Sequence, residues 1–121
     1  MAFQTRFLPT ETGNRPVEEF LDELGPKDAQ KVAWVLQLIE RLDRVPKTYL
    51  EKLPGTQEIW AVRIQGTRMI YRILGFIHRD VLWLTNAYVK KTRRTDTREI
   101  TRAERMRRNF LGREENSHVG H

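Results

Sequence analysis

Apolar and polar positions in the first part of the chain predict one short strand followed by two helices. Residues 3–7 alternate between the two kinds, as in a half-buried strand. Apolar stripes at helical spacing then run along residues 14–24, with Asn14 as a candidate N-cap, and along residues 27–42. Gly25-Pro26 separates the two stripes. Because an apolar helical stripe is buried only when another element covers it, both helices need an opposing sheet.

The second part of the chain predicts a hairpin, a further strand and a last helix. Residues 43–58 contain Pro and Gly without lasting periodicity and are interpreted as a loop. Residues 59–65 and 67–77 are rich in strand formers and meet at Gly66, which is typical of a hairpin. Residues 81–89 form the most apolar run and predict a central strand. Asp96 is a candidate cap for a helix with one apolar face, so the order β-α-α-β-β-β-α predicts an α+β fold.

Length and composition narrow the class of protein. With 121 residues, 39% hydrophobic and 31% charged, the chain predicts a single domain over 1–111 and a disordered tail over 112–121. The N-terminus lacks the pattern of a secretory signal and no run of about eighteen apolar residues appears, so we expect a cytoplasmic protein that does not enter the membrane. The absence of cysteine excludes a disulfide framework, a thiolate metal site and a cysteine nucleophile.

Positive charge is concentrated in one segment of the chain. Residues 1–58 contain 8 Lys or Arg and 10 Asp or Glu, whereas residues 59–113 contain 14 and 4, a net charge of +10. Such asymmetry is expected when one face meets a polyanion, which favours nucleic acid as the partner. The alternative is a basic surface that only improves solubility.

Several short motifs together resemble a known toxin family. They are Glu58 to Arg63, Met69 to Ile73, and Tyr88 to Thr92 with the following Arg98-Glu99-Ile100 and Ala103. Their order and spacing, with Pro16-Val17 before Glu19-Phe20-Leu21 in the first helix, resemble HigB-like toxins of the RelE/ParE superfamily along most of the chain up to Leu111. The chain departs from the pattern at Ala61, where the family usually has Glu, and at Asp96, where a Pro often stands.

The resemblance implies a fold, an activity and partners. It implies two N-terminal helices packed on a small, mainly antiparallel sheet of three to four strands, with a C-terminal helix. The implied function is that of a type II toxin: a ribosome-dependent endoribonuclease that cleaves mRNA, inhibits translation and uses no metal or other cofactor. The implied partners are the ribosome, mRNA and a cognate helix-turn-helix antitoxin.

Candidate catalytic residues follow from the chemistry of RNA cleavage. Without a metal, a base must deprotonate the 2′-hydroxyl, cations must stabilise the phosphorane, and an acid must protonate the departing 5′-oxygen. Histidine is the usual acid or base, but outside the tail the only histidine is His78, which lies in a predicted turn. Neighbouring positive charge lowers the pKa of a lysine, so Lys90 or Lys91 near Arg63 and Arg72 is the preferred base.

The remaining assignments keep a structural alternative beside the functional one. Arg63 and Arg72 interrupt apolar strands and are expected to contact phosphate, the alternative being a surface pair with a glutamate. Tyr88 is expected to stack on a base, to take part in proton transfer, or equally to be a core residue. Outer cations are expected to bind RNA electrostatically, although Lys52 and Arg68 are more simply explained as solvated loop residues. These outer residues are Lys52, Arg68, Lys91, Arg93, Arg94, Arg98, Arg102, Arg105 and Arg108.

Three other functions remain open on the sequence. The first is a ParE-like inhibitor of gyrase, which would need no catalytic base. The second is a non-catalytic nucleic-acid-binding module, which would show salt-dependent binding without cleavage. The third is a toxin that has lost its activity but kept the residues that make the fold.

Overall fold

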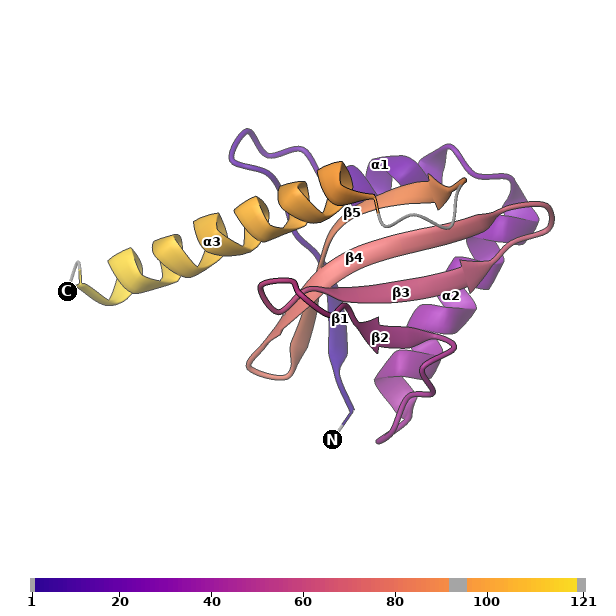
Figure 1. The fold of residues 1–121 in the computed structure, drawn as a ribbon, viewed down its shortest axis with the longest axis horizontal. Helices are drawn as coiled ribbons and strands as arrows, with labels where there is room; N and C mark the ends of the chain where they lie inside the picture. Colours follow the sequence, from indigo (N-terminus) through magenta and orange to yellow (C-terminus); the bar gives the residue numbers. More distant parts are fainter. Residues whose placement is uncertain (1, 92–95, 120–121) are drawn as a thin grey trace.

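The computed structural model describes residues 2–91 and 96–119 of the chain. Within these ranges three helices and five strands follow one another in the order β-α-α-β-β-β-β-α (Figure 1). The elements are β1 (Gln4–Phe7), α1 (Pro16–Asp22), α2 (Pro26–Arg41), β2 (Leu50–Lys52), β3 (Trp60–Gln65), β4 (Ile70–His78), β5 (Val81–Lys90) and α3 (Thr97–Val119). The predicted α+β class is confirmed.

The strands form one mixed sheet in the order β1-β5-β4-β3-β2. β1 pairs with β5 in parallel, and the other neighbours are antiparallel. The predicted loop over residues 43–58 is therefore wrong at Leu50–Lys52, and so is the expectation of three to four strands. Three residues are too few for a visible period of two, and β2 exists because β3 supplies its hydrogen-bond partners.

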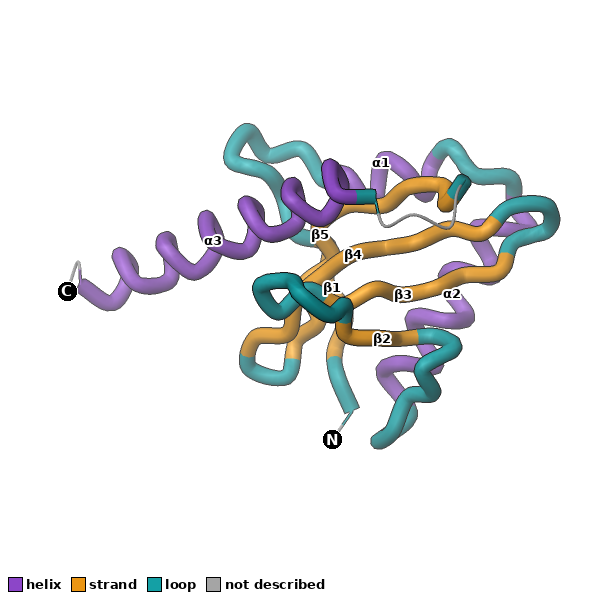
Figure 2. The backbone as a smooth tube through the Cα atoms, in the orientation of Figure 1, coloured by secondary structure: helices purple, strands orange, loops and turns teal. Residues whose placement is uncertain are grey.

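Helices cover both faces of this sheet (Figures 1 and 2). On one face, α1 and α2 bury Val17, Val35 and Ile39 against strand residues such as Ile64 and Leu82. On the other face, α3 buries its apolar side in two smaller clusters, which contain Ile100 with Ala103 and Met106 with Phe76. Among the described residues, no helix combines the length and the apolar character that a membrane crossing requires.

A β-bulge in β5 decides which side chains face α3. Leu74 pairs with Asn86 while Gly75 pairs with Leu84, so Thr85 is an extra residue in β5. Its hydroxyl shares its one proton between the Leu74 carbonyl oxygen at 3.1 Å and Asn86 Oδ1 at 2.6 Å. As a result Leu84 packs toward α1 and α2, whereas Asn86 bonds to α3 and Tyr88 packs on the α3 side.

The ends of two helices differ from the sequence-based predictions or extend them. α1 begins at Pro16 with Arg15 as N-cap, so Asn14 does not cap it. Asp96 does act at the start of α3, because its Oδ1 accepts from the Glu99 backbone amide at 3.5 Å. α3 also continues to Val119, where a tail was predicted to be disordered from Gly112. Within this extension Glu114 approaches His78 of β4, with 3.8 Å between Oε2 and Nε2.

Candidate functional site

Four of the predicted site residues lie on three adjacent strands, on the face that α3 covers. Arg63 of β3 is the direct register partner of Arg72 of β4, and Arg72 is the partner of Tyr88 of β5. Lys90, two residues after Tyr88, is the partner of Ile70. Side chains two residues apart on a strand share a face. The four polar groups therefore gather near the start of β4 and the end of β5.

Arg72 lies at the centre of this group and bonds to Tyr88. Its Nη1 donates to the Tyr88 hydroxyl at 3.4 Å. The Tyr88 ring packs against the cluster that contains Leu74 and Ala103, so the residue serves both the core and the site. Burial raises the pKa of Tyr88, the nearby Arg72 opposes this shift, and Asp96 and Glu99 add to it. The phenol therefore keeps its proton and remains a hydrogen donor.

The pKa of Lys90 is shifted in the opposite direction, downward. Burial lowers the pKa of the Lys90 ammonium, and the positive charges of Arg72 and Arg63 lower it further. Glu51 on the edge strand β2 opposes the shift. A larger fraction of Lys90 is therefore the neutral amine than in an exposed lysine, which is the form that can accept a proton.

A cavity of about 430 Å³ opens beside the two arginines. Arg63 and Arg72 form one end of it, and the cavity extends across the edge of the sheet to α2. Its lining consists of Lys31, Lys47, Thr48, Tyr49, Glu51, Ala61, Arg63, Gln65 and Arg72. The cations of this lining outnumber its single carboxylate, so the cavity favours an anionic ligand.

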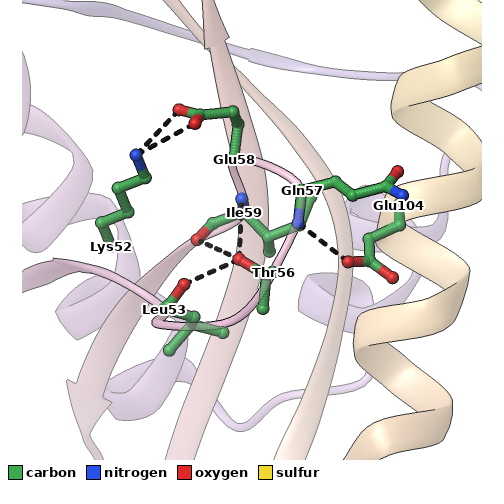
Figure 3. Close-up of polar contacts among 7 residues, drawn as sticks. All are labelled: Lys52, Leu53, Thr56, Gln57, Glu58, Ile59 and Glu104. Atoms are coloured by element: carbon green, nitrogen blue, oxygen red, sulfur yellow. Dashed lines mark hydrogen bonds and ion pairs between the residues drawn. The ribbon is translucent and has the colours of Figure 1, made fainter.

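Lys52 is held by a neighbouring carboxylate instead of joining these residues. Figure 3 shows its Nζ paired with Glu58, at 3.0 Å from Oε2. The loop between them is fastened twice: the Thr56 hydroxyl donates to the Leu53 carbonyl oxygen at 2.7 Å, and the Gln57 amide donates to Glu104 of α3 at 2.9 Å (Figure 3). Lys52 thus belongs to the surface around the β2–β3 loop.

The other predicted RNA-binding residues are spread around the site. Arg68 is exposed in the turn between β3 and β4, and Lys91 is exposed directly after β5. Arg98 and Arg102 lie on α3, where both line a shallow hollow of about 450 Å³. Arg93 and Arg94 lie outside the described residues.

The sequence missed the residues that complete the cavity. Lys31 lies on the polar side of a helical stripe, and Lys47 lies in a segment without periodicity. Neither position carries a local signal, because only the pairing of β2 with β3 brings residues 47–51 beside Arg63. Within the described residues, no group of three or more His, Asp or Glu side chains is arranged to hold a metal ion.

A comparison with protein families adds an independent observation. The model of a family described as Phage derived protein Gp49-like (DUF891) matches residues 19–108. The chain belongs to this Gp49-like family. The family is part of the RelE/HigB-type toxins, and such membership implies an antitoxin as partner. The match spans Arg63, Arg72, Tyr88 and Lys90. No curated protein and no solved structure matched the chain significantly.

Proposed function

We propose that this Gp49-like chain is the toxin of a type II toxin–antitoxin pair, of the HigB-like branch, and that it cleaves mRNA on the ribosome without a metal ion. The observation that carries the proposal is the placement of Arg63, Arg72, Tyr88 and Lys90 on one face of three adjacent strands. Together they supply a base, two cations and a proton donor, the groups that RNA cleavage needs.

In the proposed reaction, the neutral amine of Lys90 takes the proton of a 2′-hydroxyl. The 2′-oxygen then attacks the adjacent phosphorus, and the guanidinium groups of Arg63 and Arg72 stabilise the negative charge that develops on the phosphoryl oxygens. Tyr88 donates its phenolic proton to the departing 5′-oxygen. The products are a 2′,3′-cyclic phosphate and a 5′-hydroxyl end.

The surrounding charge supports a ribosome-bound substrate. Arg98 and Arg102 lie on α3, which packs on the same face of the sheet as the proposed site. Residues 59–113 together carry a net charge of +10. Cations of this kind bind ribosomal RNA through its phosphates in a salt-dependent way. A helix-turn-helix antitoxin would keep the protein inactive. Because the proposed substrate is bound to the ribosome, the proposed activity belongs in the cytoplasm.

In vitro translation of a defined message tests the proposal. New 5′ ends are mapped with and without ribosomes, for the unmodified protein and for the variants Arg72→Gln and Lys90→Met. Cuts are expected only on ribosome-bound message, and each variant is expected to reduce them about 100-fold or more. Lys27→Met, which removes an exposed lysine at the start of α2, is the matched control and is expected to cleave normally.

The two adjacent lysines separate chemistry from binding. Lys90→Ala is expected to abolish cleavage, whereas Lys91→Ala is expected only to weaken binding and to reduce its salt dependence. Equal losses for both variants would make the pair an electrostatic clamp. Intact message together with inhibited DNA supercoiling would instead point to gyrase as the target.

A further inference from the structure

The cavity beside Arg63 and Arg72 continues well past the proposed cleavage site. It crosses the edge of the sheet at β2 and reaches Lys31 on α2, with Lys47 on the way. Its volume of about 430 Å³ lies within the range of pockets that hold small organic ligands. A ligand that fills it would therefore contact the two arginines at one end and two lysines at the other.

Aromatic side chains accompany the lysines at the far end. Tyr49 lines the cavity and meets Trp34 of α2 edge to face, with 5.8 Å between the ring centroids. Lys31 places its Nζ 4.9 Å from the centroid of the Trp34 ring. Trp34 is 46% exposed, because Val32, Val35 and Leu36 already form the buried side of α2.

Aromatic rings next to cations are the arrangement with which proteins hold unpaired nucleotides. A base stacks on a ring, and neighbouring Lys or Arg side chains neutralise the backbone phosphates. A duplex does not fit such a site, because its bases already stack on one another. Arg63 ties this arrangement to the proposed reaction, since its backbone amide donates to the Tyr49 carbonyl oxygen at 2.9 Å and its side chain lines the same cavity.

We propose that this cavity binds the nucleotide that flanks the scissile phosphate in a single-stranded RNA. The base stacks on the Tyr49 ring, which lines the cavity and is supported edge to face by the exposed Trp34, and Lys31 and Lys47 hold the next phosphate. The position of the scissile bond rests on the proposed function, whereas the stacking site rests on the cavity, its lining and the contact of Tyr49 with Trp34 beside it. The site selects an unpaired strand and not a particular base, because every base offers a face to stack.

Binding of a short oligoribonucleotide tests the site without cleavage or ribosomes. The probe is a fluorescently labelled hexaribonucleotide with 2′-O-methyl sugars, which the protein cannot cleave, and binding is followed by anisotropy at several salt concentrations. Trp34→Leu and Tyr49→Leu keep an apolar side chain but remove the ring, and each is expected to weaken binding about 5- to 150-fold. Tyr49→Phe keeps the ring and is expected to restore binding. Trp34→Leu is the more secure variant because its side chain is exposed.

The lysines have a matched control on the same helix. Lys47→Ala and Lys31→Ala are each expected to reduce the salt dependence of binding by about 0.7 in log–log slope, the effect of one lost contact to a single strand. Lys27→Ala, exposed on α2 and absent from the cavity lining, is expected to leave the slope unchanged.

Several results would overturn the proposal. The first is undetectable RNA binding by the unmodified protein. The second is binding by Trp34→Leu and Tyr49→Leu that is as tight as binding by the unmodified protein. The third is an equal fall in the salt slope for Lys27→Ala and Lys47→Ala. Tighter binding of an acidic peptide than of RNA, with the same pattern among the variants, would assign the cavity to a protein partner. If the unmodified protein binds the hexaribonucleotide with the expected variant pattern but does not cleave message on ribosomes, only the catalytic assignment is contradicted. The two proposals therefore fail separately.

Discussion

Arg63 and Arg72 face each other directly across β3 and β4, and both line the same cavity. Two like charges at opposite positions of an antiparallel pair destabilise the sheet. The fold therefore tolerates a local repulsion at the place where we propose that a phosphate binds. Such a cost is expected where a site needs positive charge more than stability.

The first prediction is that removing one of these charges stabilises the protein. Arg63→Gln is expected to raise the free energy of unfolding by about 0.5 kcal/mol at low salt while it strongly reduces the proposed cleavage. The gain should shrink at about 1 M salt, where the screening length falls to about 3 Å. Urea unfolding at the two salt concentrations measures both effects.

Arg44→Gln is the control for this prediction. Arg44 is exposed in the segment after α2, so its loss should change stability little at either salt concentration. A destabilised Arg63→Gln protein would mean that Arg63 has a stabilising partner that outweighs its repulsion with Arg72.

The second prediction concerns the pH dependence that Lys90 imposes. Burial, Arg72 and Arg63 lower the pKa of Lys90 in the folded protein. The unfolded chain therefore binds more protons than the folded protein between the lowered pKa and the usual lysine value, and stability rises with pH across that window. Lys90→Met is expected to lack this rise, which thermal unfolding at a series of pH values would detect.

The same shift predicts how the proposed activity changes with pH. Cleavage should increase with pH until Lys90 has lost its proton. Arg63→Lys keeps a charge near Lys90 and should leave the midpoint of this increase almost unchanged, whereas Arg63→Gln should raise the pKa of Lys90 and move the midpoint of any residual activity to higher pH. An unchanged midpoint in Arg63→Gln would contradict the influence of Arg63 on the group that titrates, and an unchanged midpoint in Arg72→Gln as well would argue against Lys90 as the base.

The strand that carries the site shows how far the sequence reaches. Arg63 and Arg72 each interrupt an apolar run, so a period of two already places both on one face. The same counting along β5 fails, since Trp83 and Lys90 would fall on opposite faces of a regular strand. The extra residue Thr85 shifts the alternation and brings both to the α3 side, and nothing local in the sequence marks this bulge.

The cavity was beyond sequence analysis for a related reason. Tyr49 and Lys47 belong to a segment with no periodic pattern, and their position depends on three residues of edge pairing with β3. Trp34 lies on a helix that the sequence predicts correctly, but its partner Tyr49 comes from a different element. Helices and long strands can be predicted from the local sequence pattern. A site between elements cannot, because its position depends on which strands and helices lie side by side.

The third prediction concerns the turn that joins β3 to β4. Asp28 of α2 accepts hydrogen bonds from the Tyr71 hydroxyl and, at 2.8 Å each, from the amide and hydroxyl of Thr67. The Tyr71 hydroxyl, followed by the Thr67 groups, lowers the pKa of Asp28. A lowered carboxyl pKa stabilises the fold above the usual value of 3.8, and this contribution is lost as pH falls through the folded pKa.

Unfolding by urea at several pH values tests this network. The difference in stability between the unmodified protein and Asp28→Asn is expected to be constant above the usual pKa and to shrink as pH falls below it. Tyr71→Phe removes the strongest donor, so it should move acid unfolding to higher pH. Asp43→Asn, an exposed carboxylate, is the control. A difference for Asp28→Asn that stays the same at pH 7 and at pH 2 would contradict the assignment.

The fourth prediction concerns the attachment of α3 beside the site. Asn86 is fully buried, and its Nδ2 donates to the Glu99 carbonyl oxygen at 3.1 Å and to the Glu99 carboxylate at 2.8 Å. Its Oδ1 accepts from the bulge residue Thr85 at 2.6 Å. Asn86 thereby joins the irregular point of β5 to the first turn of α3.

Asn86→Ala leaves buried polar groups without partners and is expected to cost about 1–3 kcal/mol of stability. Hydrogen exchange at the Ile100 amide, which bonds to the Asp96 carbonyl oxygen in the first turn of α3, should become faster than exchange in the middle of β4. Asn109→Ala, on the same helix, is the control. Because Tyr88 follows Asn86 by two residues and packs against the cluster that contains Ile100 and Ala103 of α3, a loosened first turn should also weaken the proposed cleavage. Faster exchange throughout the sheet would instead mean that Asn86 supports the whole fold and not the docking of α3.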